Sequence, residues 1–214
     1  MRDAVSQLPT LRLAIASGVP PSHLSTLLAL QRAEEPDVTL SFFEVSDEDL
    51  VAGLQEGRYD TGLSLQGSRG PSLKSQPLWG ENMAAMMPLR CPLMNQMTLT
   101  LAALRDYPLF RWQAESCALL DQRLSSLVPA DDKNIQYVTS FEMMALWVAA
   151  GYGIGVAAQS RIERTRAWEI TMQPLSDGPY QIVTHLLQPV GRANPVSERF
   201  ERRALKVASR ACAS

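Results

Sequence analysis

Residues 38–65, VTLSFFEVSDEDLVAGLQEGRYDTGLSL, contain a strand, a helix and a second strand in direct succession. Residues 38–45 are rich in β-branched and aromatic side chains, which is typical of a strand. Ser46 then begins an S-x-x-[DE] capping box, and Gly57 is a typical helix-ending residue. Residues 59–65 (YDTGLSL) return to a strand-like pattern. A strand, a helix and a strand in this order predict a βαβ unit of a parallel sheet.

The segment before this unit extends the same pattern toward the N-terminus. Leu11–Ala16 (LRLAIA) predicts a short buried strand, which the turn residues Ser17–Pro21 stop. Leucines at helical spacing predict a helix over Ser22–Glu34, with Ser22 as its cap and Pro36 beyond its end. The first 65 residues therefore indicate a doubly wound α/β lobe.

The rest of the chain contains a second series of alternating strands and helices. Asn82–Pro88 (NMAAMMP) has conflicting propensities, and we expect it to be an extended segment that crosses toward a second lobe. The expected elements after it are the helix-like Leu101–Arg105, strand Leu109–Trp112, helix Glu115–Leu127, strand Ile135–Val138, helix Ser140–Ala150, strands Ile154–Ala158, Trp168–Leu175 and Gln181–Leu187, and helix Val196–Ala208. Two series joined by extended crossings predict two lobes with a cleft, lobe I over 11–81 and 186–214 and lobe II over 82–185.

The overall charge argues against a self-sufficient nucleic-acid-binding domain. The 20 Lys and Arg residues oppose 22 Asp and Glu residues, for a net charge of -2, whereas such domains usually have a basic excess. The basic run near the C-terminus (Arg199, Arg202, Arg203, Lys206, Arg210) is interrupted by acidic and apolar residues, which favours a solvated amphipathic helix. The sequence contains neither a signal-peptide pattern nor a membrane-length apolar run, so we expect a cytoplasmic protein without membrane contact.

Few side chains are available for catalysis or metal binding. The two histidines, His23 and His185, are far apart in the sequence, and the three cysteines, at 91, 117 and 212, have no CxxC spacing. The run Gly151–Gly155 follows a predicted helix and precedes a predicted strand, which is the reverse of a dinucleotide fingerprint, so it is expected to be a helix end and turn. We therefore expect no metal, no cofactor and no enzymatic activity.

Motifs spread along the chain resemble the effector-binding regulatory domain of LysR-type transcriptional regulators, from Leu11 to about Val207. LRLAIASG and residues 38–65 resemble that family's first strand, its P-x-V-x-L segment and its L-x-x-G-x-x-D motif. LAALRDYPLF and TSFEMMALWVAAGYGIGVAAQ resemble its L-x-D-L-x-x-x-P-L segment and a helix followed by V-x-x-G-x-G-I. The residues that carry two of these motifs are Leu54, Gly57 and Asp60, then Val148, Gly151, Gly153 and Ile154.

The resemblance implies an α/β fold of the type 2 periplasmic-binding-protein class, two Rossmann-like lobes joined by two crossing strands. It implies a sensor that binds a small, anionic effector in the interlobe cleft and acts on DNA only through an N-terminal winged helix-turn-helix, which is absent here. Residues 1–10 would then be the end of a linker. It also implies a homodimer or tetramer that pairs the first helix and strand two with the second lobe of another subunit. A stand-alone solute-binding protein or an enzyme of the same fold is the alternative.

In lobe I, the expected ligand contacts lie where strands end. Ser17 and Gly18 follow the first strand at its carboxyl end, where open α/β sheets place ligands, although simple turn chemistry also explains both. Ser46 matches a family position that presents a hydroxyl to the effector, and its capping role alone is the alternative. Ser64 ends the third strand and is expected to line the same cleft.

In lobe II, a similar turn is expected to close on the effector. Thr139, Ser140 and Phe141 correspond to that turn of the family, and Thr139 begins a T-x-x-E capping box. Helix N-termini in both lobes would suit a carboxylate or another anion. Arg111 and Trp112 follow a strand and could face the cleft, where they would suit a planar acid; a surface arginine and a packing tryptophan are the alternative.

Overall fold

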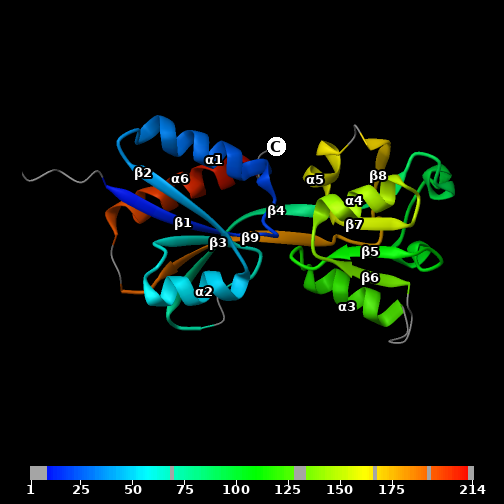
Figure 1. Ribbon diagram of the computed structural model, residues 1–214, viewed down its shortest axis with the longest axis horizontal. Helices are drawn as coiled ribbons and strands as arrows, with labels where there is room; N and C mark the ends of the chain where they lie inside the picture. The colour runs from blue at the N-terminus through cyan, green and yellow to red at the C-terminus, as the bar shows by residue number, and fades with distance from the viewer. Residues whose placement is uncertain (1–8, 68–69, 128–133, 166–167, 192–193, 212–214) are drawn as a thin grey trace, which may run out of the picture. The chain divides into compact units, whose positions relative to one another are not determined.

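The computed structural model describes residues 9–67, 70–127, 134–165, 168–191 and 194–211, which form two compact units (Figure 1). Unit 1 contains the described residues up to Trp79 together with those from Thr184 onward, and unit 2 is Gly80–Val183. Two strands, β4 (Leu73–Pro88) and β9 (Gln181–Pro189), contribute residues to both units. Most of the expected linker segment, residues 1–10, lies outside the described residues.

Unit 1 is a sheet covered by helices on both faces. Its elements besides β4 and β9 are β1 (Thr10–Ala16), α1 (Pro21–Glu34), β2 (Thr39–Val45), α2 (Asp47–Glu56), β3 (Thr61–Ser64) and α6 (Pro195–Ala211). The strand order is β2-β1-β3-β9, with β1 parallel to both neighbours and β9 antiparallel to β3. Figure 1 shows α1 and α6 on one side of this sheet and α2 on the other. The parallel βαβ units expected from residues 11–65 are confirmed.

The core of unit 1 consists of apolar side chains from the predicted strands and helices. The fully buried members include Leu11, Leu13, Leu27, Leu50, Leu54, Leu63 and Phe200. They come from both strands and helices, so removing their apolar surface from water stabilises the sheet and its helices together. The carboxyl ends of β1 and β2, where the ligand contacts were expected, are therefore held on a packed scaffold.

The first two helices of unit 1 start differently. Helix α2 begins as expected, because the Ser46 hydroxyl accepts a hydrogen bond from the Asp49 N–H at 3.1 Å. Helix α1 begins at Pro21, and its N-cap is Pro20, which has no capping side chain. The expectation that Ser22 caps α1 is wrong. Proline fits the first helical position because its φ is already helical and its missing N–H would have no partner there.

Unit 2 has a second sheet with helices on both faces. Its elements besides β4 and β9 are the 3-10 helices η1 (Pro92–Asn95) and η2 (Leu101–Leu104), strands β5 (Leu109–Trp112), β6 (Ile135–Val138), β7 (Ile154–Ala158) and β8 (Ile170–Pro174), and helices α3 (Ala118–Leu127), α4 (Phe141–Ala149) and α5 (Gln159–Arg164). The strand order is β4-β7-β5-β6, and β8 pairs with β4. Strand β5 is parallel to β6 and β7, while β4 is antiparallel to β7. Figure 1 shows α4 and α5 on one face and α3 on the other.

Two helices of unit 2 differ from the sequence expectation, and both differences matter for the site. Helix α3 begins at Ala118 rather than at Glu115, whose backbone N–H bonds the Trp112 carbonyl in a turn at 3.1 Å. Helix α5 was not expected; it follows β7 directly. In the other direction, Gly151 has a φ of 83°, which confirms the expected helix end after α4.

In the described part of the chain, none of the helices combines the length and the apolar character that a bilayer span requires. The same residues contain no group of three or more His, Cys, Asp or Glu side chains that could hold a metal ion.

Candidate functional site

In unit 1, the carboxyl ends of β1 and β2 meet at the turn that contains Ser17. The Ser17 N–H donates to the Val45 carbonyl at 3.2 Å, and its hydroxyl approaches the same oxygen at 3.4 Å. Ser17 is half-buried and Gly18 is buried. Because β1 and β2 are parallel, their ends lie at one edge of the sheet, which is where α/β folds bind ligands.

The other two expected contacts of unit 1 have different environments. Ser46 is exposed, and its hydroxyl caps α2. Ser64 is buried; its hydroxyl donates to the Asp47 carboxylate and accepts from the Gln66 N–H at 2.8 Å. The Ser64 hydroxyl therefore joins the end of β3 to the first turn of α2.

In unit 2, three parallel strands end at one edge, and aromatic side chains join their ends. Strands β5, β6 and β7 end at Trp112, Val138 and Ala158. The Trp112 indole N–H donates to the Thr139 carbonyl at 3.0 Å. The Trp112 and Phe141 rings are 6.3 Å apart, and both side chains are buried. The turn from Thr139 to Phe141 is therefore held against the end of β5.

The helix cap at this edge is shifted by one residue from the expected T-x-x-E box. Ser140 is the N-cap of α4: its hydroxyl accepts from the Met143 N–H at 3.3 Å and donates to the Glu142 carboxylate at 3.0 Å. Thr139 is exposed, and Trp112 holds its carbonyl at the end of the strand. Adjacent Thr and Ser are both good caps, so local sequence could not choose between them.

Arg111 is not a surface residue, and its guanidinium is not free to bind a ligand beside the Trp112 indole. It is 1% exposed, and its guanidinium donates to the Val156 carbonyl at 3.0 Å, to the Glu115 carbonyl at 3.3 Å and to the Asp121 carboxylate at 2.8 Å. Its Nε has no hydrogen-bond partner among the described residues. The alternative that Arg111 is a surface arginine is wrong. Its guanidinium instead forms an ion pair and hydrogen bonds within unit 2.

The cation beside the indole is Arg161, which the sequence reasoning missed. Its Cζ lies 4.6 Å from the Trp112 ring centroid and 5.7 Å from that of Phe141. Its Nε donates to one carboxylate oxygen of Glu115 at 2.9 Å, and the other oxygen accepts from the Ala158 N–H at 3.0 Å. We call Trp112, Glu115, Phe141 and Arg161 the Arg161 cluster. Its members come from three separate segments, residues 112–115, α4 and α5, so local spacing gave no signal for the whole cluster.

Glu115 has an unusual protonation equilibrium. Burial raises the pKa of the Glu115 carboxyl to about 7, although the Arg161 charge and the Ala158 N–H act in the opposite direction. The side chain is fully buried, so water does not stabilise the ionised form. At neutral pH this carboxyl is therefore poised between its two protonation states.

Comparisons with known proteins agree with this architecture. The sequence model of the family described as "LysR substrate binding domain" matches residues 6–209. A probable hydrogen peroxide-inducible genes activator of Mycobacterium avium is 28% identical over 156 residues, which is 71% of this chain and 50% of that protein. The uncharacterized HTH-type transcriptional regulator YnfL of Escherichia coli (strain K12) is 34% identical over 99 residues, 46% of this chain and 33% of that protein. The chain thus spans half or less of the length of these curated relatives.

Solved structures of low sequence identity share the fold. The effector binding domain of QuiR in complex with shikimate has a TM-score of 0.80 at 17% identity, covering 94% of this chain and 97% of that one. The BenM effector binding domain with its effector benzoate has a TM-score of 0.80 at 17% identity, covering 94% and 93%. A reduced form of OxyR from N. meningitidis has a TM-score of 0.79 at 18% identity, covering 93% and 95%. The expected fold class is confirmed.

Proposed function

The chain belongs to the LysR substrate-binding domain family, and from this we propose that it is the ligand-sensing domain of a LysR-type bacterial transcription regulator. The family model matches residues 6 to 209, which supports a sensor role for the fold described above. The related structures described as effector-binding domains support the same role.

We further propose that the strand edge of each unit carries contacts for a small anionic effector. Ser17, Gly18 and Ser46 would contribute from unit 1, and Trp112, Thr139 and Ser140 from unit 2. The observation that carries this proposal is that exposed or half-buried hydroxyls stand at the carboxyl ends of parallel strands in each unit. Of the remaining expected residues, Ser64, Arg111 and Phe141 would position these groups, since all three are buried.

Between the starts of α2 and α4, the anionic group of the effector is expected at the start of α4. Helix N-termini favour anions, but the first turn of α2 already carries three acidic residues, Asp47, Glu48 and Asp49. The first turn of α4 carries one, Glu142. Because like charges repel, the start of α4 is the more favourable of the two for an anion.

Effector binding would regulate by shifting a conformational equilibrium. A ligand can shift such an equilibrium only by its difference in affinity for the two states. We propose that the bound state changes how the intact regulator presents its DNA-binding domain. This part of the proposal concerns the whole regulator. The chain itself spans only half of the length of the Mycobacterium avium relative.

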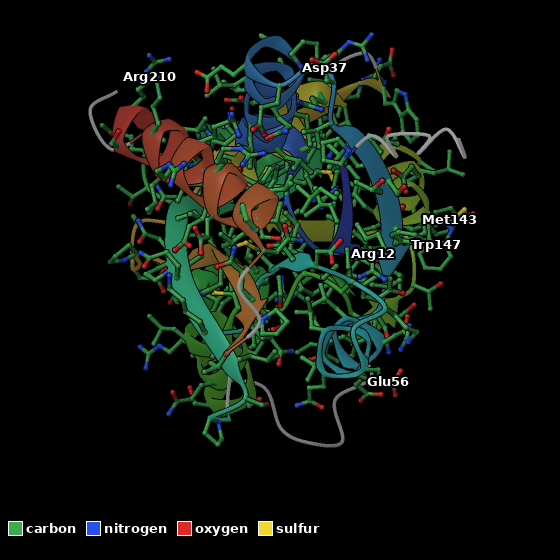
Figure 2. The ribbon with its side chains drawn as sticks, turned by 90° about the vertical axis from the view of Figure 1, so that its left-hand side faces the viewer. Arg12, Asp37, Glu56, Met143, Trp147 and Arg210 are labelled. Atoms are coloured by element: carbon green, nitrogen blue, oxygen red, sulfur yellow. The ribbon has the colours of Figure 1, made fainter. Side chains whose placement is uncertain are left out.

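We propose that the domain acts as a homodimer. Strand β2 is an edge strand of the unit 1 sheet, and its Phe42 is 54% exposed. Helix α4 of unit 2 exposes Met143 and Leu146, and Figure 2 shows Met143 at the edge of the molecule. These apolar surfaces support the pairing of the first helix and strand two of one subunit with the second lobe of another.

Among the described residues, the pair of Ser75 and His185 could suggest hydrolysis, but its surroundings support a non-catalytic role. The Ser75 hydroxyl lies 3.3 Å from His185 Nδ1 in unit 1. Within the described ranges His185 has no hydrogen bond to a carboxylate, and a nucleophile–base pair normally needs a third group that orients the base. Burial also lowers the pKa of His185, which makes it a weaker base.

A thermal-shift screen of the 214-residue chain tests the proposed function. Carboxylates, amino acids, sugars and sugar phosphates are added separately, because a ligand that binds only the folded state raises Tm. We expect one anionic class to raise Tm, with Ser17→Ala and Thr139→Ala each weakening binding roughly tenfold, as loss of a hydrogen bond to a charged group does. Thr26→Ala, an exposed hydroxyl on α1, is the control. A Tm that no compound changes would contradict the proposal.

A peroxide-sensing thiol is the competing hypothesis, because one relative is a probable hydrogen peroxide-inducible genes activator. The Cys117 side chain is buried, and burial raises the pKa of its thiol, which disfavours the reactive thiolate. A peroxide-induced change that dithiothreitol reverses and Cys117→Ser abolishes would favour this hypothesis over the effector hypothesis.

A further inference from the structure

A basic groove lies where α6 meets the end of α1 in unit 1. Four cations, Arg199, Arg202, Arg203 and Lys206, recur at the i, i+3, i+4 and i+7 positions of α6, so their side chains share one face of the helix. Together with Glu34 of α1 they line an open groove of about 260 Å³. Figure 1 shows the two helices side by side over the sheet. A space of this size suits a small ligand.

Two of the four cations are held in place by buried groups. Arg203 is 8% exposed, and it donates to the buried Gln31 and to the mostly buried Glu35. Arg199 donates from its Nε to the other oxygen of the Glu35 carboxylate. Contacts that fix a guanidinium before a ligand arrives reduce the entropy lost on binding. The groove therefore has pre-organised cations.

The protein does not use every donor of these cations. Within the described part of the chain, the exposed Arg202 guanidinium has neither an ion pair nor a hydrogen bond, and Arg199 uses only its Nε. Lys206 donates to Glu34 at 3.2 Å, and an ammonium group has three donors. Donors of three cations therefore remain for an acceptor from outside the protein.

The groove carries an excess of two positive charges. Four cations and one acid line it, and Glu35, which pairs with Arg199 and Arg203, adds a second acid. Burial acts to raise the pKa of Glu35, but hydrogen bonds outweigh burial, and this pKa is lowered. Hydrogen bonds from Lys206 and Arg203 lower the pKa of Glu34. Both acids are therefore ionised at neutral pH, and the excess of positive charge persists.

The other charged residues of the two helices do not line the groove. They are Arg32 on α1 and Glu198, Glu201 and Arg210 on α6. Glu201 pairs with Lys74 of β4 at 2.6 Å. Arg32, Glu198 and Arg210 together carry two positive charges and one negative charge. They therefore do not cancel the positive charge of the groove.

Two positive charges in one small groove match a dianion. Guanidinium groups suit carboxylate and phosphate oxygens, and a lysine ammonium also binds phosphate. A phosphate monoester carries two charges on three oxygens around one phosphorus atom, whereas a dicarboxylate carries them on two separate groups. Arg199, Arg202 and Arg203 lie within about one turn of α6, so one compact group can contact more than one of them. A phosphate therefore fits the groove better than a dicarboxylate.

We propose that this groove is a binding site for a dianionic phosphate, either inorganic phosphate or the terminal phosphate of a small ester. Arg199, Arg202 and Lys206 contact the phosphate oxygens, and Arg203 is a positioning residue that joins α6 to α1. The site lies within unit 1, and none of its residues is among those proposed to contact the effector. It is a second ligand site of the domain and does not rest on the effector proposal.

The first experiment measures, by titration calorimetry at pH 7.5 and constant ionic strength, the binding of three probes to the 214-residue chain. The probes are inorganic phosphate, glycerol 3-phosphate and dimethyl phosphate, a monoanion that represents a nucleic-acid backbone. We expect at least one dianion to bind with a Kd of about 1 mM or lower and dimethyl phosphate to bind at least about tenfold more weakly. The tighter of the two dianions identifies free phosphate or an ester as the source. Binding of dimethyl phosphate as tight as that of the dianions, or no binding at all, overturns the inference.

A second titration at pH 5 tests whether the dianion is the bound species. The second pKa of a phosphate monoester is about 6, so most of the ligand is a monoanion at pH 5. The lowered pKa values of Glu34 and Glu35 keep both acids ionised, and the four cations keep their charge. We expect the affinity to fall at least about tenfold between pH 7.5 and pH 5. An unchanged affinity would exclude a dianion site.

Variants test the location of the site. Arg202→Gln removes a cation without an ion pair among the described residues, so it should fold as wild type. It should bind phosphate about tenfold more weakly, as the loss of a charge-assisted hydrogen bond predicts. Arg32→Gln removes the same charge from an exposed position of α1 outside the groove, and this matched control should bind as wild type. Unchanged binding by Arg202→Gln, or equal weakening by both variants, contradicts the proposed site.

The same variants separate this site from the proposed effector site. Sugar phosphates in the thermal-shift screen could raise Tm through either one. A rise in Tm that Arg202→Gln abolishes and Ser17→Ala leaves unchanged supports the groove. A rise that Ser17→Ala abolishes and Arg202→Gln leaves unchanged overturns the groove and supports the effector site.

Discussion

At the residue scale, Glu115 shows how burial can outweigh a salt bridge. The carboxyl has a cationic partner at 2.9 Å and a backbone N–H at 3.0 Å, yet its pKa is raised. Removing an ionised carboxylate from water costs several kcal/mol, and one ion pair does not always offset that cost. The stability of unit 2 should therefore depend on pH through this side chain.

We predict that Glu115 lowers the stability of the fold as pH rises from about 4.5 to 7. Below this window both the folded and the unfolded chain are protonated at Glu115; within it the unfolded chain loses its proton first, since the folded pKa is about 7. Above pH 7, the resulting loss in the free energy of unfolding reaches about 3 kcal/mol. Urea unfolding of wild type and Glu115→Gln at pH 5, 6, 7 and 8 measures it.

The difference between the two proteins is the quantity to compare. His185 acts in the opposite direction, because burial lowers its pKa and makes stability rise with pH in the range just below its usual value. That contribution is common to both proteins and cancels in the difference. Unfolding free energies that run parallel from pH 5 to pH 8 would show that Glu115 is ionised throughout.

Also at the residue scale, the cap of α4 distinguishes two neighbouring hydroxyls. We predict that Ser140→Ala lowers the free energy of unfolding by about 1 kcal/mol, because it removes the acceptor for the Met143 N–H. Thr139→Ala, which removes an exposed side chain, should change it by less than about 0.5 kcal/mol. Chemical denaturation of both variants measures this change. A larger loss of unfolding free energy for Thr139→Ala than for Ser140→Ala would mean that Thr139 caps α4, as the T-x-x-E pattern predicted.

At the element scale, two strands of unit 1 are joined by the family motif. The Asp60 carboxylate accepts from the Arg12 backbone N–H at 2.8 Å and from the guanidinium at 2.7 and 3.1 Å, which ties β1 to the start of β3. Gly57, three residues earlier, has a φ of 78°, which favours glycine after a helix. In the L-x-x-G-x-x-D pattern, the glycine thus ends a helix and the aspartate joins two neighbouring strands by hydrogen bonds.

The basic run of α6 also has a structural role. Arg203 is nine-tenths buried and donates to Gln31 at 3.1 Å, Glu34 at 2.8 Å and Glu35 at 2.9 Å on α1. Two further basic residues of α6, Arg199 and Lys206, pair with the same two acids. The helix expected from the sequence is confirmed as amphipathic, but the expectation that its basic face is solvated is wrong for Arg203, which is buried and pairs with α1.

We predict that Arg203→Ala destabilises unit 1 by roughly 2 kcal/mol, because it removes one of the two cations that pair with the mostly buried Glu35 and the donor to the buried Gln31 side-chain oxygen. Arg202→Ala, an exposed neighbour on the same helix, is the matched control and should cost less than about 0.5 kcal/mol. Urea unfolding measures both. Equal effects of the two variants would mean that Arg203 contributes only as a surface charge.

At the scale of the whole molecule, the exposed apolar residues of β2 and α4 belong to different units. We predict that the chain is a dimer in analytical ultracentrifugation and that Phe42→Glu and Met143→Glu each weaken dimerisation at least about tenfold, because a buried charge replaces an apolar contact. Leu119→Glu, an exposed leucine on α3, is the control. A wild-type chain that stays monomeric at high concentration would contradict the proposed pairing.

The sequence by itself determined the order of the elements apart from η1 and α5, the parallel βαβ units, the cap at Ser46, the helix end at Gly151 and the family. These features depend on residues within a few positions of one another, where periodicity, capping and turn chemistry act. Only the tertiary structure decided that Arg111 is buried, that Ser64 holds α2, that Ser140 rather than Thr139 caps α4 and that Arg161 lies on Trp112 and Phe141. Burial, and competition for hydrogen-bond partners between segments far apart in the chain, decide these features, and neither can be read from local sequence.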